Sequence, residues 1–153
     1  MNEIYKEMRK RAFTTKPEDI RIILENNQQV YAAVVDMNIK GNLVSLVCIF
    51  DGSVSLYYSN GKCDIGLGKK EKIKKAAISF LISSGQCIHI MNKTVNYSGE
   101  TENMKVYLFT KAGIYLKEIS ISKPESKEEK FLNFLVNNVL SAIDGAESFI
   151  PAE

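Results

Sequence analysis

The sequence contains no tryptophan, one histidine and only three cysteines among its 153 residues. Cys48, Cys63 and Cys87 are odd in number and form no Cys-x-x-Cys pair, which argues against a disulfide framework and against a zinc knuckle. A zinc site needs more ligands than one histidine and scattered cysteines supply, so we expect no metal site. We also expect no cofactor. A reducing cytosol suits isolated thiols best, so we expect a cytoplasmic protein.

Excess charge of one sign and long apolar runs are also lacking. Twenty Lys and Arg against eighteen Asp and Glu leave a net charge of +2, too balanced for a dedicated nucleic-acid binder. The apolar stretches fall short of the roughly 18 residues that a membrane-spanning helix needs, and the first residues carry acids where a secretion signal is apolar. We therefore expect no nucleic-acid partner, no membrane partner, and a single domain over residues 1–153 with ends 1–14 and 145–153 prone to fray.

Strand-forming and helix-forming runs follow one another along the chain. The Asp51-Gly52 dipeptide separates two strand-like runs, and it predicts a hairpin with a type I′ turn, in which both central residues have positive φ. The order αβββαβββα favours an α+β fold with one antiparallel sheet of about six strands and three helices. In element order it resembles the profilin and roadblock folds. The pattern predicts helices at residues 17–26, 69–84 and 124–143, and strands at 30–37, 43–50, 53–58, 86–91, 104–110 and 114–122.

A longer pattern joins several of these segments. It consists of the Asp-Gly hairpin and Ser-Leu-Tyr strand in residues 51–61, the glycine-rich approach to a helix at 66–68, and the late Thr-x-x-Gly turn that ends at Gly113. This pattern resembles that of a family of small uncharacterised bacterial proteins. The resemblance implies a bacterial source and brings no assigned activity. The chain departs from the family at residues 62–64, where the family is richer in glycine.

The loop from Gly61 to Gly68 is the first candidate site, because it leads into a lysine-rich helix. Glycines let backbone N–H groups approach an anion, and the amino end of a helix carries positive potential. The spacing matches neither a dinucleotide-binding nor a P-loop pattern, so glycines that only form a bulge and a turn are the alternative. The residues that would hold a small anion or a nucleotide phosphate are Asn60, Gly61, Gly66, Gly68, Lys69 and Lys70.

The last predicted helix is unusually apolar. Nine of the thirteen residues from Phe131 to Ile143 are apolar, more than one core-facing stripe requires. A second apolar face would need a partner, which predicts a homodimer; a helix wedged deeply into its own domain is the alternative. The residues predicted to form the interface are Leu132, Val136, Leu140 and Ile143.

The thiols offer a third hypothesis. Cys87 and His89 lie two apart in a predicted strand and would project from the same side as thiolate and base, although packing is the simpler interpretation. Cys63 lies in the glycine-rich loop and is the best candidate for a reactive thiol, whereas Cys48 is expected in the core. The sequence contains no nucleophile elbow, zinc-protease or Walker pattern. It favours a cytosolic, non-enzymatic interaction or regulatory module that forms a dimer, ahead of an anion binder and of a thiol enzyme.

Overall fold

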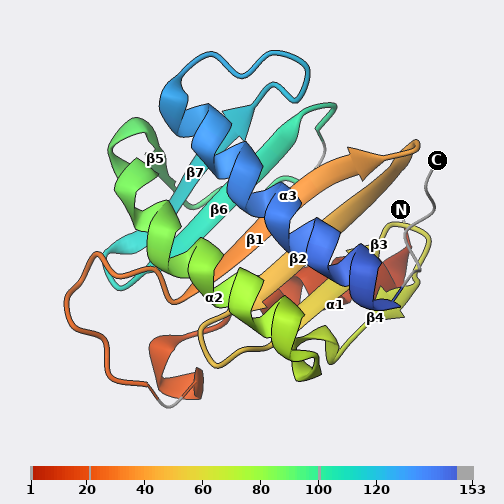
Figure 1. The fold of residues 1–153 in the computed structure, drawn as a ribbon, viewed down its shortest axis with the longest axis horizontal. Helices are drawn as coiled ribbons and strands as arrows, with labels where there is room; N and C mark the ends of the chain where they lie inside the picture. The colour runs from red at the N-terminus through yellow and green to blue at the C-terminus, as the bar shows by residue number, and fades with distance from the viewer. Residues whose placement is uncertain (1, 21, 100, 148–153) are drawn as a thin grey trace.

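The computed structural model describes residues 2–20, 22–99 and 101–147. Within them, seven antiparallel strands form one sheet in the order β4-β3-β2-β1-β6-β7-β5, and helices cover both of its faces (Figure 1). The strands are β1 (Ala32–Ile39), β2 (Asn42–Ile49), β3 (Val54–Tyr58), β4 (Cys63–Asp64), β5 (Asn92–Thr94), β6 (Met104–Thr110) and β7 (Gly113–Ile119). The α-helices are α1 (Glu3–Phe13), α2 (Glu71–Ser84) and α3 (Lys127–Glu147), and the 3₁₀-helices are η1 (Pro17–Ile20), η2 (Leu67–Lys69) and η3 (Gly85–Ile90). The α+β class and the order α-βββ-α-βββ-α are confirmed.

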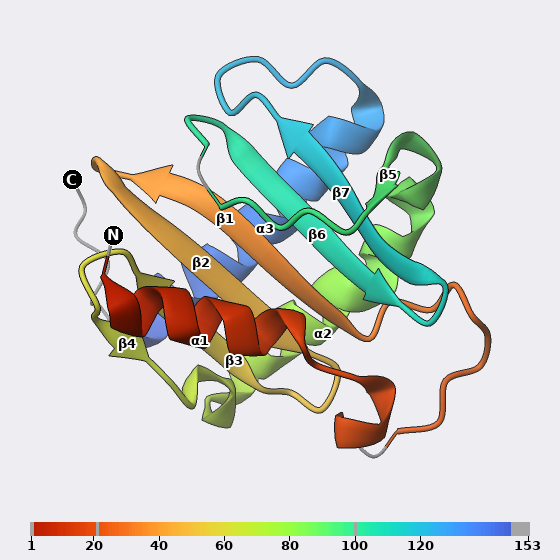
Figure 2. The same cartoon turned by 180° about the vertical axis from the view of Figure 1, so that it is seen from behind.

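The central strand β1 is buried on both faces. Because successive side chains of a strand alternate between faces, Ala33 and Val35 pack under α2 and α3, whereas Ala32 and Val34 point to the face that α1 crosses. Figure 2 shows α1 lying across the sheet on this second face. No helix in the described part of the chain is long and apolar enough to cross a membrane.

The helix α2 forms where the sequence predicts it. Its core residues recur at helical spacing, and Gly85 follows its last turn as the predicted stop. All five predicted core positions are buried, namely Ile73, Ala76, Ala77, Phe80 and Leu81.

The predicted β2–β3 hairpin is present, but its turn type was wrong. Gly52 has φ 96°, whereas Asp51 is not among the described residues with positive φ. The Gly52 N–H donates to the carbonyl of Ile49 at 2.9 Å, as in a longer loop that a left-handed glycine closes. The hairpin between β1 and β2 is the one with two positive φ values, at Lys40 (52°) and Gly41 (83°), as a type I′ turn requires.

The amino-terminal prediction was also wrong. The expected helix at 17–26 is only the short η1, and the true first helix, α1, occupies a segment expected to fray. Asn2 caps α1 by accepting from the N–H of Ile4 at 2.7 Å. Tyr5 is only 1% exposed, so its burial against the sheet helps to hold α1 in place.

A second wrong assignment concerns residues 86–91, which form η3 and not a strand. A short apolar run is compatible with either structure, and periodicity alone does not distinguish them. The small edge strand β5 follows η3 and pairs with β7. At the carboxyl end, residues 145–147 continue α3 where fraying was expected, and residues 148–153 lie outside the described residues.

A close backbone approach between Gly68 and the β2–β3 turn gives a first test. A Cβ atom at position 68 would overlap the carbonyl oxygen of Gly52, so we expect Gly68→Ala to lower the free energy of unfolding by about 2 to 3 kcal/mol. Gly85 has φ −57° and only an ordinary contact at 3.8 Å, so Gly85→Ala should leave stability unchanged or slightly raised. Urea denaturation measures both, and equal midpoints would contradict the close approach.

Candidate ligand-binding groove

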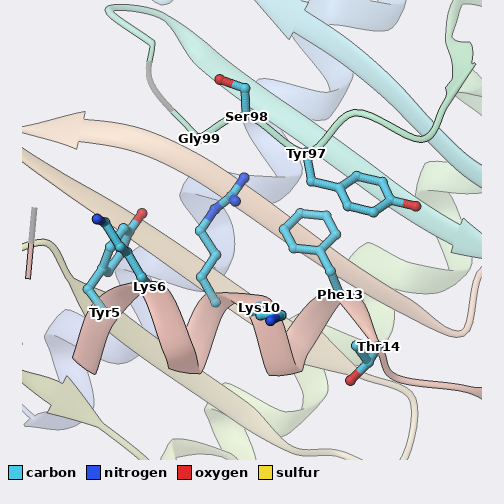
Figure 3. A pocket seen from close by; sticks show the side chains of 9 residues that line it. Tyr5, Lys6, Lys10, Phe13, Thr14, Tyr97, Ser98 and Gly99 are labelled. Atoms are coloured by element: carbon cyan, nitrogen blue, oxygen red, sulfur yellow. The ribbon is translucent and has the colours of Figure 1, made fainter. Parts of the chain in front are cut away.

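A groove runs between α1 and the extended segment 95–99 that follows β5 (Figure 3). Its volume is about 710 Å³, within the range of small-molecule sites. The lining residues combine aromatic rings with long cationic side chains. They are Tyr5, Lys6, Arg9, Lys10, Phe13, Thr14, Tyr97, Ser98 and Gly99.

A buried ion pair lies at the base of this groove. Arg9 contacts Asp36 with both ends of its guanidinium, Nη2 to Oδ2 at 2.6 Å and Nε to Oδ1 at 3.2 Å. The carboxylate is fully buried and also accepts from Ser45 Oγ at 2.5 Å. Ser45 stands opposite Asp36 in the β1–β2 register, and its hydroxyl bonds to that of Tyr5 at 2.7 Å. The network thus ties two turns of α1 to the two middle strands.

Burial in this network changes the titration of its members. Burial alone would lower the pKa of Arg9, but the hydrogen bond and charge of Asp36 outweigh it and raise that pKa, so the guanidinium stays charged. Burial raises the pKa of Tyr107 to about 12, with the Asp36 charge adding to it. Burial also raises the pKa of Tyr5. Both phenols therefore stay protonated at neutral pH.

One end of the groove is an aromatic wall. The rings of Phe13 and Tyr97 stack with centroids 4.5 Å apart and planes 11° apart. Tyr107 meets Phe13 edge-on at 4.8 Å. Arg9 Cζ lies 4.6 Å from the centre of the Phe13 ring, so the guanidinium and the rings form one packed unit.

The segment 95–99 is held by side chains of the sheet. Its Ser98 carbonyl accepts from the Tyr107 hydroxyl at 2.9 Å and from Lys105 Nζ at 3.0 Å. Gly99 packs on Arg9 so closely that a Cβ there would lie 2.9 Å from the guanidinium carbon. Only glycine allows this approach without displacing the Arg9 side chain.

Three of the six predicted anion-binding residues lie together. Gly66, Gly68 and Lys69 line a hollow of about 390 Å³, beside the β2–β3 turn. Lys74 of α2 and Asp51 of the turn also line it. The hollow therefore offers two ammonium groups and one carboxylate.

The other three predicted residues lie elsewhere. Asn60 and Gly61 form the β3–β4 turn, where the Asn60 carbonyl accepts from the Asn2 side chain at 3.4 Å. Lys70 directly precedes α2 and does not line the hollow. The unpredicted strand β4 separates the two ends of the loop, so its glycines do not act as one cradle.

The predicted interface residues of α3 are core residues. Leu132, Val136 and Ile143 are buried beneath α3, and Leu140 is half-buried against the same core. The structure thus corresponds to the alternative of a helix wedged into its own domain, because these side chains already pack within the chain. The large apolar residue that α3 exposes is Phe134. Homodimer formation stays a prediction, without these four residues as its support.

Neither of the two buried thiols, Cys48 and Cys87, is activated as a nucleophile. Burial raises the pKa of Cys48 to about 12, and burial followed by the Glu128 charge raises that of Cys87. Cys87 and His89 lie in η3 and not in the predicted strand. His89 Nε2 lies 3.2 Å from a carboxylate oxygen of Glu128. Cys63 is half-buried, and its reactivity stays a prediction.

In the described ranges, no group of three or more His, Cys, Asp or Glu residues could hold a metal ion.

The residues that build the groove were missed, although the sequence held two signals. Tyr5, Met8 and Ala12 recur at helical spacing, and Asp36 interrupts the apolar run of residues 30–37. A charge in a central strand needs a buried partner, which could have led to a search for a cation. Tyr97 lies in a polar loop and had no signal.

Comparisons of the chain with protein-family models, with curated proteins and with solved structures gave no match.

The buried pair gives a second test. Arg9→Met leaves Asp36 buried without a cation, so we expect the free energy of unfolding to fall by about 3 to 5 kcal/mol. Adding Asp36→Asn should recover much of that loss, because no buried charge then remains. Lys6→Met on the same helix is the control, since its exposed pair with Glu3 is worth less than about 1 kcal/mol. Chemical denaturation measures the free energy of unfolding of all three variants. An equal loss for Arg9→Met and Lys6→Met would show that the buried pair matters no more than the exposed one.

Proposed function

We propose that this protein is a non-enzymatic binding module, and that the groove between α1 and residues 95–99 takes a small ligand with a flat apolar body. The observation that carries the proposal is the stacked pair of Phe13 and Tyr97 at the wall of a groove of about 710 Å³. Arg9 and Tyr97 cover the Phe13 ring, so a planar ligand would gain by burying its apolar surface against the parts of these rings that stay exposed in the groove.

The polar groups of the groove support binding and not chemistry. Arg9 is occupied by Asp36, and the Tyr5 hydroxyl is occupied by Ser45. The lining residues that the structure describes include no His, Cys, Asp or Glu, which are common nucleophiles and general bases. A ligand in this groove therefore meets a preformed surface with fixed polar groups.

A neutral aromatic probe tests this function. We expect 2-naphthylmethanol to move the amide NMR signals of α1 and of residues 95–99, because the groove is the surface that fits it. Tyr97→Ser should weaken its binding by about fivefold, the loss of one ring contact. Phe134→Ser removes an exposed ring from α3, away from the groove, and should leave the affinity unchanged. Equal affinities for the two variants, or shifts spread over the whole chain, would argue against the groove.

A small-anion site in the hollow at Gly66, Gly68 and Lys69 is a second candidate function. The observation that favours it is that these predicted residues meet Lys74, an ammonium group from another element. The Asp51 carboxylate opposes an anion, although it already accepts from the Ser53 N–H at 2.9 Å.

Inorganic phosphate is the probe for this second site. We expect a titration to move the amide signals of residues 51–55 and 66–69 first, and the double variant Lys69→Gln/Lys74→Gln to abolish those shifts. Lys130→Gln on the exposed side of α3 is the charge-matched control. If phosphate shifts no amide signal in either segment, the hollow is not an anion site and the loop glycines have only a structural role.

A further inference from the structure

We propose that the ligand of the α1 groove carries an oxyanion, a carboxylate or a phosphate, which Lys6 and Lys10 hold at the rim of the groove beside its apolar body. This inference rests on the proposed function and names the chemical class of the ligand.

The balance of charge in the groove is the main observation. Lys6, Arg9 and Lys10 line it, and among the residues that the structure describes no acidic side chain does. The charge of Arg9 is cancelled by the bidentate contact with Asp36, which lies beneath the groove and not in its lining. What remains is two ammonium groups on one side of an aromatic wall.

These two ammonium groups are weakly committed to other partners. The described ion-pair partner of Lys6 is Glu3 at 3.4 Å, and their side chains are 54% and 88% exposed. An exposed pair of this kind contributes little and is screened by salt. Among the residues that the structure describes, no acidic group lies within 4.0 Å of Lys10 Nζ. Both lysines can therefore turn to a ligand at small cost.

The helix places the two lysines together. Residues four apart on an α-helix are neighbours, with about 5 to 6 Å between their Cβ atoms, so one oxyanion can contact both ammonium groups. Low-dielectric walls strengthen the field of charges beside them, and here Phe13 and Tyr97 supply such walls. Figure 3 shows Lys6 and Lys10 on successive turns of α1, with Phe13 and Tyr97 at one end of the groove. A cation would be repelled at this rim.

Arg9 does not take part as an anion anchor. Its guanidinium lies between Phe13 and Gly99, and its side chain is only 13% exposed. An anion that competed for it would leave Asp36 buried and unpaired, which is costly. The exposed lysines therefore recognise the anion, and the buried arginine has a positioning role.

The test compares probes that share one ring system, on the full chain, by amide NMR titration. We expect 2-naphthoate to bind at least tenfold tighter than 2-naphthylmethanol at low salt, and 2-naphthyl phosphate at least as tightly as the carboxylate. The advantage of both anions should shrink as sodium chloride is raised towards 1 M, because exposed charges are then screened. A preference for one anion over the other shows which source of the oxyanion the groove favours.

Variants separate the two proposals. The double variant Lys6→Gln/Lys10→Gln should reduce the advantage of the acid over the alcohol to less than about twofold, whereas Lys130→Gln should leave it intact. If the alcohol binds in the groove and the acid binds no tighter, the oxyanion inference is overturned and the proposed function stands. If no probe binds in the groove, both are overturned.

Discussion

The buried pair of Arg9 and Asp36 is the interaction on which the arrangement of this protein depends. It lies between the first helix and the middle strand of the sheet, and a carboxylate with no exposure is tolerable there only because a cation and a hydroxyl satisfy it. The pair fixes α1 across β1 and β2 and sets the position of Phe13 one turn further on. The groove exists because α1 is held in this place.

The two faces of the sheet are packed by different means. Under α2 and α3 the core is almost purely apolar, with side chains such as Phe80 and Leu132 fully buried. On the α1 face a polar network and a cluster of aromatic rings replace it. The first face supplies most of the hydrophobic stabilisation, and the second carries the groove with Lys6 and Lys10 at its rim. The α1 face is therefore the one whose shape suits a small ligand.

The sequence predicted the parts of the fold that local patterns encode. The helix α2 and the strand pairs around it follow from apolar spacing and turn residues, and these reflect nearby residues in the chain. The predictions for residues 17–26 and 86–91 were wrong because short segments take their structure from tertiary packing. Less of the candidate sites could be predicted. The hollow contains only half of the predicted loop residues. The groove was not predicted, because its residues are far apart in the sequence.

By itself, the sequence determined the class of the fold, the order of its helices and strands, and the apolar residues of α2 and of the central strands. Alternation and helical spacing are local properties, so they can be read along the chain. The tertiary structure decided where α1 lies on the sheet and that the apolar surface of α3 is buried in its own core. It also decided that Arg9 pairs with a buried carboxylate, whereas Lys6 and Lys10 stay exposed. The pairing of Arg9 depends on Asp36, which is 27 residues away in the sequence but in contact with it in the fold. Which side chains a fold brings together is a property of long-range packing, and no local pattern carries it.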